Sequence, residues 1–577
     1  MMPEAIRSRR GLLQCTLQDY ESRFAGRHKL HQVLRYWAKR KPEAVALVDH
    51  RRGRRLCWRE FESRAAALAR ELLRLGFVPG DYLAVSLPFL IEHILLEYAC
   101  FQIGVIHAPL DLRLPADEVI RSLGLIRAKG FVFAGRVGAA DWSELGRAVR
   151  AHCPFVQHRI QFAPPEEAVE GATPWAELAA RAETPAGGAE AAALEAARVR
   201  ASAAVREEDG AQVIFTTGST GPPKPALLSH RNITCQNMCL GAAFSFGEDT
   251  RLLINLPPSH VGGQSETLMT TLFWGGTAIV LDLFDAAASL AAIQQHRVNL
   301  LGQIPAMFNF QWRLPDYARY DLSSLKLAVY GGQQVARPFL ERLAAMAPGI
   351  ATGLGLTEAA GFCTYTPPGA QAEDILGNLG YAMPVYPLSI RQAMREDGRA
   401  GDELPDGEIG HICFRGPQTF LGYVNDEAAT AQTVSREGYL YTGDMGFKDS
   451  RGLHLAGRAK WVVKPAGYQI FPGQVEEHFC ALADKVAACG VVGVPHPLLT
   501  EALVAFIEKK PGAELSVTEL RRHARGLASY LRPLYYVLLE PGQMPLNRAA
   551  KVDYVRLKQM ALATAEREPA EKSEEIS

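Results

Sequence analysis

The chain has 577 residues, of which 48% are hydrophobic and 21% are charged. This length exceeds what one hydrophobic core supports, and the composition excludes a disordered or membrane-embedded protein. Its 62 basic residues balance 62 acidic ones, so no global charge favours nucleic acid or an anionic membrane as a partner.

The cysteines and the first ten residues indicate the cellular compartment of the protein. The ten cysteines are scattered, without the paired spacing of a metal site, which favours a reducing, cytoplasmic setting. Cys235 and Cys239 stand at helical spacing, and we interpret them as core packing. No apolar run is long enough to span a bilayer, and the arginine-rich segment 1–10 is not followed by the apolar segment of a secretory signal.

The first part of the chain alternates helical and strand-like patterns. A helix is predicted over 61–75, a strand over 82–87 and a second helix over 91–102. This order predicts β-α units around a parallel sheet, and therefore an α/β fold. Residues 164–208 are rich in Ala and Glu, and we interpret them as helical surface decoration or a loose connection without chemistry.

From residue 212 onward the strand signals become sharper. A strand over 213–216 is followed by a glycine- and proline-rich turn and by a helix that begins near Asn232. Further strands are predicted at 252–256, 277–281, 325–329 and 411–414.

The pattern changes after Gly457 to that of a separate compact unit. Its predicted elements are strands at 462–463, 488–494 and 503–507 and a helix at 517–527. We therefore place a domain boundary near 457–460. Residues 564–577 are charged and poor in apolar side chains, which is typical of a frayed tail.

Residues 215–225, Phe-Thr-Thr-Gly-Ser-Thr-Gly-Pro-Pro-Lys-Pro, follow a predicted strand directly. Hydroxyl groups and glycine amides packed this densely can surround a polyphosphate, and Lys224 can add a point charge. The spacing matches neither of the two common glycine-rich nucleotide motifs. Taken alone, the segment fits phosphate binding or an ordinary surface turn.

Other short motifs follow in order along the chain. They are Leu256 to Gly263 around His260, Gly331-Gly332-Gln333, Leu354-Gly355-Leu356-Thr357-Glu358, Tyr441-Thr442-Gly443-Asp444, Gly457-Arg458, Lys464-Pro465-Ala466-Gly467-Tyr468 and Pro545 to Lys551. Each alone is compatible with a turn or a surface residue. The evidence for a functional site is therefore the order in which these motifs follow one another along the chain.

Over residues 30–555 this ordered set resembles the adenylate-forming superfamily, which includes acyl-CoA synthetases, firefly luciferase and peptide-synthetase adenylation domains. The resemblance implies a large N-terminal AMP-binding adenylation domain of several subdomains over 1–456. It also implies a hinge at 457–460 and a small, mobile α+β C-terminal domain over 461–577.

The resemblance also implies a nucleotide site. The glycine-rich loop would hold the β- and γ-phosphates of ATP through Thr216, Ser219, Thr220 and Lys224. Thr357 would contact phosphate, and Glu358 would bind Mg²⁺, since a hard cation that bridges phosphate oxygens needs a carboxylate ligand. The adenine would lie against Gly331, Gly332, Gln333 and Leu354.

For the ribose, the matching residues are Asp444, which would bond both hydroxyls, and Arg458, which would reach the ribose or a phosphate. Leu354 replaces the aromatic residue usual at its position, and Gln333 replaces a small one. Gly407 to Tyr423 also follows the family pattern, and we interpret that segment as scaffold.

The remaining assignments concern the two half-reactions. Lys551 would be the adenylation lysine, Lys460 the hinge and Gly467 the residue that leaves room for a pantetheine arm. His260 matches a position beside the acyl site that can gate it, and Gly355 with 359–361 would wall the acyl pocket. Two further departures from the family are Trp461, in place of an acidic residue, and Ala550, in place of Gly.

The implied activity is ATP-dependent ligation of a fatty, aryl or alicyclic carboxylic acid to coenzyme A through an acyl-adenylate. Two alternatives stay open. One is delivery to a carrier-protein thiol, although the chain contains no recognisable carrier domain. The other is a catalytically weak nucleotide- or acyl-binding protein, suggested by the departures from the family. The sequence does not indicate the oligomeric state.

Overall fold

The computed structural model describes residues 14–137, 140–183, 188–216, 223–367, 369–465, 470–546 and 551–567. The chain folds into two compact units. Residues 1–216, 224–388 and 414–440 form the first unit, and residues 217–223, 389–413 and 441–577 form the second. The predicted hinge at 457–460 lies within the second unit and stays a prediction.

The first unit contains an eight-stranded sheet in the order β23-β11-β10-β4-β3-β5-β8-β9. Its strands are β3 (Tyr82–Ser86), β4 (Ile106–Pro109), β5 (Gly130–Ala134), β8 (His158–Phe162), β9 (Thr173–Pro174), β10 (Gly210–Phe215), β11 (Pro225–Ser229) and β23 (Gly422–Tyr423). The strands from β10 to β9 pair in parallel, whereas β11 pairs antiparallel with both β10 and β23. The parallel strands are largely apolar because both faces are covered.

Helices cover this sheet much as the sequence predicted. Helix α3 (Trp58–Arg74) packs on α4 (Ile91–Ile103), and both contact α8 (Ala189–Ala204). Glu60 fixes the start of α3, because its carboxylate accepts a hydrogen bond from the Cys57 amide at 2.9 Å. In α8 the buried Arg198 donates to Gln102 of α4, so this part of 164–208 is a packed helix rather than a loose connection.

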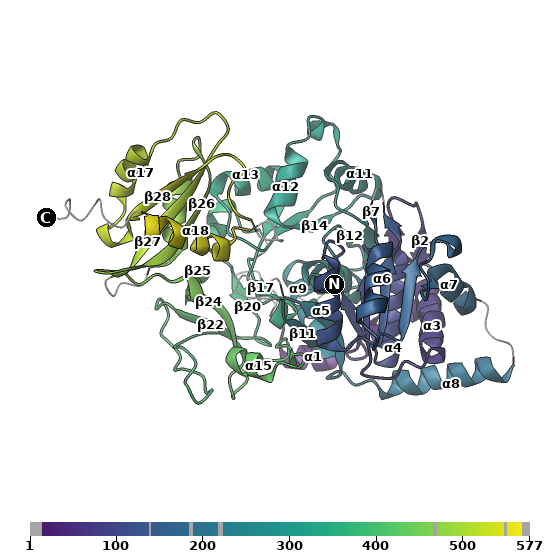
Figure 1. Ribbon diagram of the computed structural model, residues 1–577. Helices are drawn as coiled ribbons and strands as arrows, with labels where there is room; N and C mark the ends of the chain where they lie inside the picture. The colour runs from purple at the N-terminus through teal and green to yellow at the C-terminus, as the bar shows by residue number, and fades with distance from the viewer. Residues whose placement is uncertain are drawn as a thin grey trace. The chain divides into compact units, whose positions relative to one another are not determined.

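A seven-stranded sheet in the same unit has the order β16-β15-β14-β12-β13-β1-β2. Its strands are β1 (Val45–Asp49), β2 (Arg55–Cys57), β12 (Arg251–Ile254), β13 (Thr277–Val280), β14 (Leu300–Gln303), β15 (Leu327–Tyr330) and β16 (Gly349–Ala351). Helices α11 (Ala286–His296), α12 (Pro305–Trp312) and α13 (Arg337–Met346), teal in Figure 1, share one apolar core with it. All strands but β2 run parallel.

The second unit contains two smaller sheets. A four-stranded sheet has the order β21 (Leu388–Arg391), β22 (Gly410–Phe414), β24 (Leu440–Asp449) and β25 (Gly452–Arg458). A three-stranded sheet joins β26 (Val486–His496), β27 (Thr500–Lys509) and β28 (Tyr535–Leu539). Because side chains alternate along a strand, one face packs on α16 (Pro472–Cys480) and α17 (Val517–His523), and the other on α18 (Tyr554–Arg567), as Figure 1 shows in olive and yellow.

The fold also contains other helices and three two-stranded ribbons. The helices are α1 (Leu17–Arg23), α2 (Leu30–Arg40), α5 (Ala116–Ile126), α6 (Ser143–His152), α7 (Trp175–Glu183), α9 (His230–Ala243), α10 (Thr270–Phe273), α14 (Ala372–Ile375) and α15 (Glu427–Thr433). Two-stranded ribbons join β6 (Arg136–Val137) to β7 (Ala140–Asp141), β17 (Gly355–Leu356) to β18 (Gly361–Phe362), and β19 (Thr364–Tyr365) to β20 (Tyr381–Ala382). Helix α9 begins at His230 because Ser229 caps it.

Two local predictions were wrong. The strand predicted at 462–463 is a single bridge between Val463 and Ile470, preceded by a 3₁₀ turn over Ala459–Trp461. The predicted tail starts too early, because α18 continues to Arg567, and 568–577 lie outside the described residues. In the second case the charged composition outweighed a helical periodicity that continues from the buried Leu557 and Ala561.

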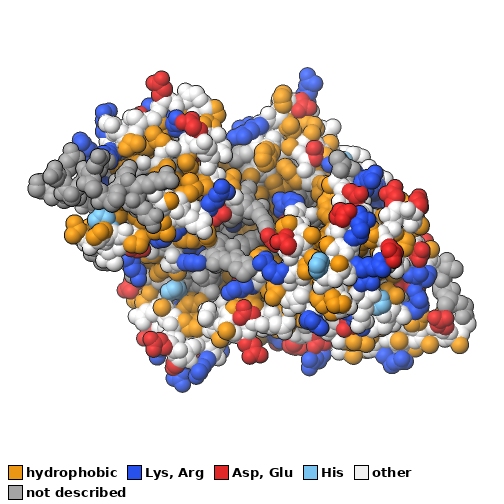
Figure 2. Space-filling model, viewed as in Figure 1, with side chains coloured by type: hydrophobic (Ala, Val, Ile, Leu, Met, Phe, Trp, Pro, Cys, Tyr) orange, Lys and Arg blue, Asp and Glu red, His pale blue; other side chains and the backbone are white. Residues whose placement is uncertain are grey.

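The surface reflects the balanced charge of the sequence. On the face seen in Figure 2, basic and acidic side chains are interspersed among the residues that the structure describes. In the same described ranges, no helix combines the length and the apolar character needed to cross a membrane.

Candidate functional site

The candidate site of the first unit lies at one edge of the seven-stranded sheet. Neighbouring strands β12, β14, β15 and β16 run parallel, so the segments that follow them emerge at the same edge. These segments contain His260, Gly331 to Gln333 and Leu354 to Glu358. The carboxyl edge of parallel strands is where α/β proteins bind ligands. The fold therefore gathers three predicted motifs at one edge.

The glycine pair after β15 has a structural reason. The Gly331 amide donates to the Gln303 carbonyl at 3.2 Å, and Gly332 has a φ of 92°, which favours glycine. Gln333 is exposed, whereas Leu354 is buried and only 9% exposed. A leucine at this position offers an apolar surface but no aromatic ring for stacking.

A tight turn presents Thr357 and Glu358 after β17. Residues Thr357–Ala359 form a 3₁₀ turn that ends at Ala360, whose φ of 59° is unusual for a residue with a side chain. The Ser265 hydroxyl donates to the Ala360 carbonyl, which holds this conformation. Thr357 is buried, and Glu358 is half-buried.

The described ends of the glycine-rich loop are fixed by β10 and β11. The Thr216 amide donates to the Lys224 carbonyl at 2.9 Å, and the Lys224 amide donates to the Thr216 hydroxyl at 3.1 Å. This pairing continues the β10-β11 register beyond Phe215 and Pro225. Ser219 and Thr220 lie outside the described residues, so their predicted contacts with phosphate stay predictions.

Tyr423 links this loop to Glu358. Its hydroxyl donates to Glu358 Oε1 at 2.6 Å, and Lys224 Nζ lies 5.0 Å from the centre of its ring. Burial, and then the Glu358 charge, raise the pKa of Tyr423, so the phenol stays a donor. The Phe420 amide also donates to the Glu358 carbonyl. The segment Gly407 to Tyr423, which we interpreted as scaffold, therefore supplies hydrogen-bond donors to Glu358, a predicted site residue.

His260 stands immediately before a π-helix, η3 (Gly262–Met269). Its Nδ1 accepts a hydrogen bond from the Gly262 amide at 3.0 Å, which assigns the proton of the neutral ring to Nε2. In η3 the Glu266 amide donates to the Val261 carbonyl, five residues back, and the Thr267 hydroxyl donates to the carbonyls of Gly262 and Gly263. Such π-helical turns occur frequently at functional sites.

In the second unit, Asp444 and Arg458 pair across β24 and β25. Arg458 Nε lies 2.9 Å from Asp444 Oδ1, and Arg458 Nη1 donates to the Thr442 carbonyl at 3.4 Å. The side chain of Asp444 is only 8% exposed, whereas that of Arg458 is 54% exposed. The aspartate is thus anchored, and the arginine is accessible.

Lys551 belongs to the same cluster. Burial lowers its pKa first, the Arg458 charge lowers it further, and the Asp444 charge opposes both. The predicted ribose pair and the predicted adenylation lysine are therefore close enough to interact electrostatically. Ala550 lies outside the described residues.

The residues around the predicted hinge form a second cluster. Lys460 Nζ lies 5.5 Å from the ring of Trp461, and that ring stacks on Tyr554 with centroids 5.7 Å apart and an interplanar angle of 29°. The Tyr554 hydroxyl donates to Glu476 at 2.9 Å. Tyr554 opens α18, three residues after Lys551, so this stack connects the hinge segment to the lysine segment. Gly467 lies outside the described residues.

Two residues of the first-unit site were not predicted. Tyr423 is the last residue of the segment from Gly407 that follows the family pattern, and we interpreted that segment as scaffold. Glu266 lies in η3, and only the π-helical geometry reveals its position, since a regular α-helix would turn it to a different face.

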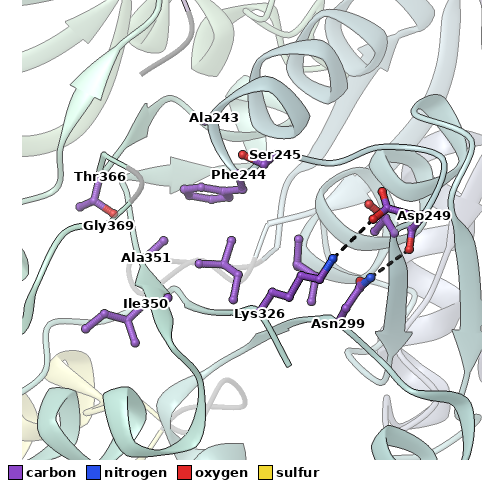
Figure 3. Close-up of a pocket in the computed structure, with 14 residues that line it drawn as sticks. Ala243, Phe244, Ser245, Asp249, Asn299, Lys326, Ile350, Ala351, Thr366 and Gly369 are labelled. Carbon is purple, nitrogen blue, oxygen red and sulfur yellow. Dashed lines mark hydrogen bonds and ion pairs between the residues drawn. The ribbon is translucent and has the colours of Figure 1, made fainter. Parts of the chain in front are cut away.

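A separate cavity of about 220 Å³ lies at the opposite edge of the seven-stranded sheet. Figure 3 shows Lys326 and Asn299 pointing toward Asp249, with an ion pair of 3.5 Å and a hydrogen bond of 2.9 Å. Its lining includes Leu300, Leu327 and Gly349, which are the first residues of β14, β15 and β16. It is therefore remote from the carboxyl edge and forms no part of the candidate site.

The surroundings of Glu358 fit the magnesium ion that the sequence predicts there. Its Oε1 accepts from Tyr423, and its Oε2 accepts no hydrogen bond from any described residue. One carboxylate is what Mg²⁺ commonly takes from a protein when phosphates and water complete its shell. Within the described ranges, no group of three or more His, Cys, Asp or Glu side chains could hold a metal by itself.

Comparisons with known proteins agree with this geometry. Residues 34–424 match the AMP-binding enzyme family, and residues 474–551 match the AMP-binding enzyme C-terminal domain. The chain is 31% identical over 503 residues to a feruloyl-CoA synthase of an Amycolatopsis species, covering 86% of this chain and 92% of that protein.

Two further proteins extend the comparison. A 3-[(3aS,4S,7aS)-7a-methyl-1,5-dioxo-octahydro-1H-inden-4-yl]propanoyl:CoA ligase of Mycobacterium tuberculosis is 29% identical over 523 residues, covering 90% and 96% of the two chains. The crystal structure of ATP-bound MatB from Rhodopseudomonas palustris superposes with a TM-score of 0.78 at 23% identity, over 92% of this chain and 99% of that one. The chain therefore belongs to the AMP-binding enzyme family, within the adenylate-forming superfamily.

Proposed function

We propose that this protein is an AMP-forming carboxylic acid:CoA ligase. It uses ATP to convert a carboxylic acid into an acyl-adenylate and transfers the acyl group to the thiol of coenzyme A. The observation that carries this proposal is the contact of Tyr423 with both Glu358 and the end of the glycine-rich loop. It supports a polyphosphate and cation site at the carboxyl edge of the sheet. The ten cysteines, none in a disulfide and all within the described residues, favour the cytoplasm.

In the first step a carboxylate oxygen attacks the α-phosphorus, and pyrophosphate leaves. Because both reactants are anions, the enzyme must neutralise charge and hold them in line. Lys551 acts on the attacking carboxylate and the α-phosphate, whereas Lys224 and the loop hydroxyls of Thr216, Ser219 and Thr220 act on the departing phosphates. Mg²⁺ held by Glu358 would supply further positive charge to those phosphates.

The nucleotide is held by the other predicted residues. Asp444 accepts from the ribose hydroxyls, and its ion pair with Arg458 holds the carboxylate in place. Gly331 to Gln333 and Leu354 contact the adenine through backbone and apolar surface, and Thr357 contacts phosphate. His260 stands beside the acyl group and gates its entry.

In the second step the CoA sulfur attacks the acyl carbonyl, and AMP leaves. Lys551 must withdraw before the thiol can enter, so we propose that the smaller C-terminal domain rotates about Lys460. Gly467 then leaves room for the pantetheine arm. No covalent enzyme intermediate is needed in either step.

Pyrophosphate release over a panel of fatty, aryl and alicyclic acids tests this proposal. We expect acid-dependent pyrophosphate from the protein with ATP and Mg²⁺, and thioester only when CoA is added. Pyrophosphate without CoA-dependent AMP release would indicate a carrier-protein acceptor. No pyrophosphate with any acid would favour a nucleotide- or acyl-binding protein without this activity.

A further inference from the structure

Glu266 is a carboxylate that the proposed mechanism does not use. It lies in the middle of η3, deep in the first unit, yet its side chain keeps accessible surface. Its carboxylate forms no hydrogen bond or ion pair with any described residue. A deep carboxylate that keeps accessible surface without a partner faces a space that a ligand can enter.

The neighbours of Glu266 place it at the predicted acyl wall. A Cβ added to Gly355 would lie 3.1 Å from Glu266 Oε1, and one added to Gly361 would lie 2.9 Å from the same atom. A Cβ on Gly262 would lie 3.5 Å from Glu266 Oε2 and 3.1 Å from His260 Nδ1. The carboxylate thus stands beside the β17-β18 ribbon and near the histidine proposed to gate the acyl group.

Gln236 of α9 supplies a second polar group at the same corner. It is fully buried, and its Oε1 accepts from Asn237 at 3.0 Å, but its Nε2 finds no partner. The Cβ position on Gly361 lies 3.0 Å from this Nε2 as well. Unsatisfied buried donors are uncommon in folded proteins because each one is costly. This corner of the predicted acyl wall is therefore polar, and one of its buried hydrogen-bond donors has no acceptor.

The electrostatics of the corner are unfavourable without a ligand. Burial raises the pKa of Glu266 to about 8, and no neighbouring cation among the described residues lowers it. An ionised carboxylate in such surroundings is stabilised strongly by a cation that reaches it. With a hydrocarbon at the same place the carboxyl keeps its proton, and no ion pair forms.

We infer that Glu266 is a specificity-determining residue that selects a carboxylic acid bearing an amino group. The inference rests on the proposed ligase function. The ammonium group of the acid forms an ion pair with Glu266, while the reacting carboxylate lies on the side of His260. Because Glu266 and His260 both adjoin Gly262, the amine and the carboxylate belong to a compact acid rather than to a long chain.

Matched acids test this inference. Pyrophosphate release is measured with 3-ethylbenzoic, 3-(hydroxymethyl)benzoic and 3-(aminomethyl)benzoic acids, and with pentanoic and 4-aminobutanoic acids. In the aromatic set and in the aliphatic set, we expect the wild-type kcat/KM for the amine-bearing acid to be at least about tenfold higher than for its apolar counterpart. The hydroxy acid, a neutral donor, is expected between them. This comparison needs no variant.

The variant Glu266→Gln keeps the shape of the side chain and removes its charge. We expect it to reduce the preference for the amine to about twofold or less, with the KM for ATP and the thermal midpoint close to wild type. Glu248→Gln, which removes a surface carboxylate that is 51% exposed, should leave the preference unchanged.

Three results would overturn the inference. They are a wild-type preference for the apolar acids, no preference at all, or an unchanged preference in Glu266→Gln. Absence of pyrophosphate with every acid would instead overturn the proposed ligase function, and the two failures are therefore distinguishable.

Discussion

The Tyr423 hydroxyl donates a hydrogen bond of 2.6 Å to Glu358 Oε1 and joins the two sheets of the first unit at the candidate site. Tyr423 lies on β23 of the eight-stranded sheet, and Glu358 follows the end strand β16 of the seven-stranded sheet. The hydrogen bond leaves Glu358 Oε2 available to a cation and brings the ring of Tyr423 under Lys224. A single phenol thus orients both charged residues proposed to act on the phosphates of ATP.

Tyr423→Phe tests this arrangement. Removing a hydrogen bond to a charged group costs about 1.5–3 kcal/mol, so we expect kcat for adenylation to fall about tenfold or more. The Mg²⁺ concentration for half-maximal activity should rise as Glu358 loses its orientation. Pyrophosphate release measured against Mg²⁺ checks both effects. Tyr320→Phe, at a half-buried tyrosine on the sheet core, is the control, and equal behaviour of the two variants would contradict the role of Tyr423.

Much of this architecture could be predicted from the sequence. The helix around 91–102 and the strands at 277–281 and 503–507 agree with the structure to within a few residues, because their apolar periodicity matches their burial. The ordered motifs also indicated the residues at the carboxyl edge, since the ends of parallel strands meet there.

Tertiary contacts explain what the sequence did not predict. Tyr423 becomes a site residue only because β23 adds antiparallel to β11, a pairing between segments almost 200 residues apart that local sequence does not encode. Glu266 reaches the predicted acyl wall through the π-helical turn of η3, which regular helix periodicity does not anticipate. Trp461 departs from the family pattern, and the structure gives it a partner in Tyr554.

Trp461→Ala tests the connection between hinge and lysine segments. An aromatic pair contributes about 0.5–1.5 kcal/mol, so loss of the stack on Tyr554 should slow adenylation about 3- to 10-fold by loosening the segment that carries Lys551. Trp461→Phe keeps a ring and should recover most of that rate. Single-turnover adenylate formation measures the effect. The connection is refuted if the two variants slow adenylation equally.

The buried network of Glu97 predicts a stability effect of pH. Burial raises the pKa of Glu97 to about 8, and its Oε1 lies 3.3 Å from His107 Nδ1 and accepts from Gln212 at 2.8 Å. Burial also lowers the pKa of His107 to about 3, so a neutral Glu97 can donate to it. Between pH 4.5 and 8 only the unfolded chain loses this proton, so the contribution of Glu97 to stability falls as the pH rises through this window and then levels off.

Glu97→Gln removes this titration while it keeps a donor and an acceptor. Relative to wild type, we expect the variant to gain stability between pH 5 and pH 8, on the order of a few kcal/mol. Urea denaturation of both proteins at the two pH values measures the difference. Glu166→Gln, at an exposed residue, is the control, and a pH-independent difference between Glu97→Gln and wild type would show that Glu97 is already ionised in the fold.

The central claim is that Lys551 neutralises the carboxylate and the α-phosphate in the first step and is not needed in the second. Its position beside Asp444 and Arg458 supports this division. The direct measurement separates the two half-reactions in Lys551→Ala, with Lys510→Ala, at an exposed lysine of the same unit, as control. We predict that Lys551→Ala loses adenylate formation by about a thousandfold, as expected for a group acting on developing charge, and still forms thioester from supplied acyl-adenylate and CoA. Equal loss of both half-reactions, or full adenylation by the variant, would contradict the account.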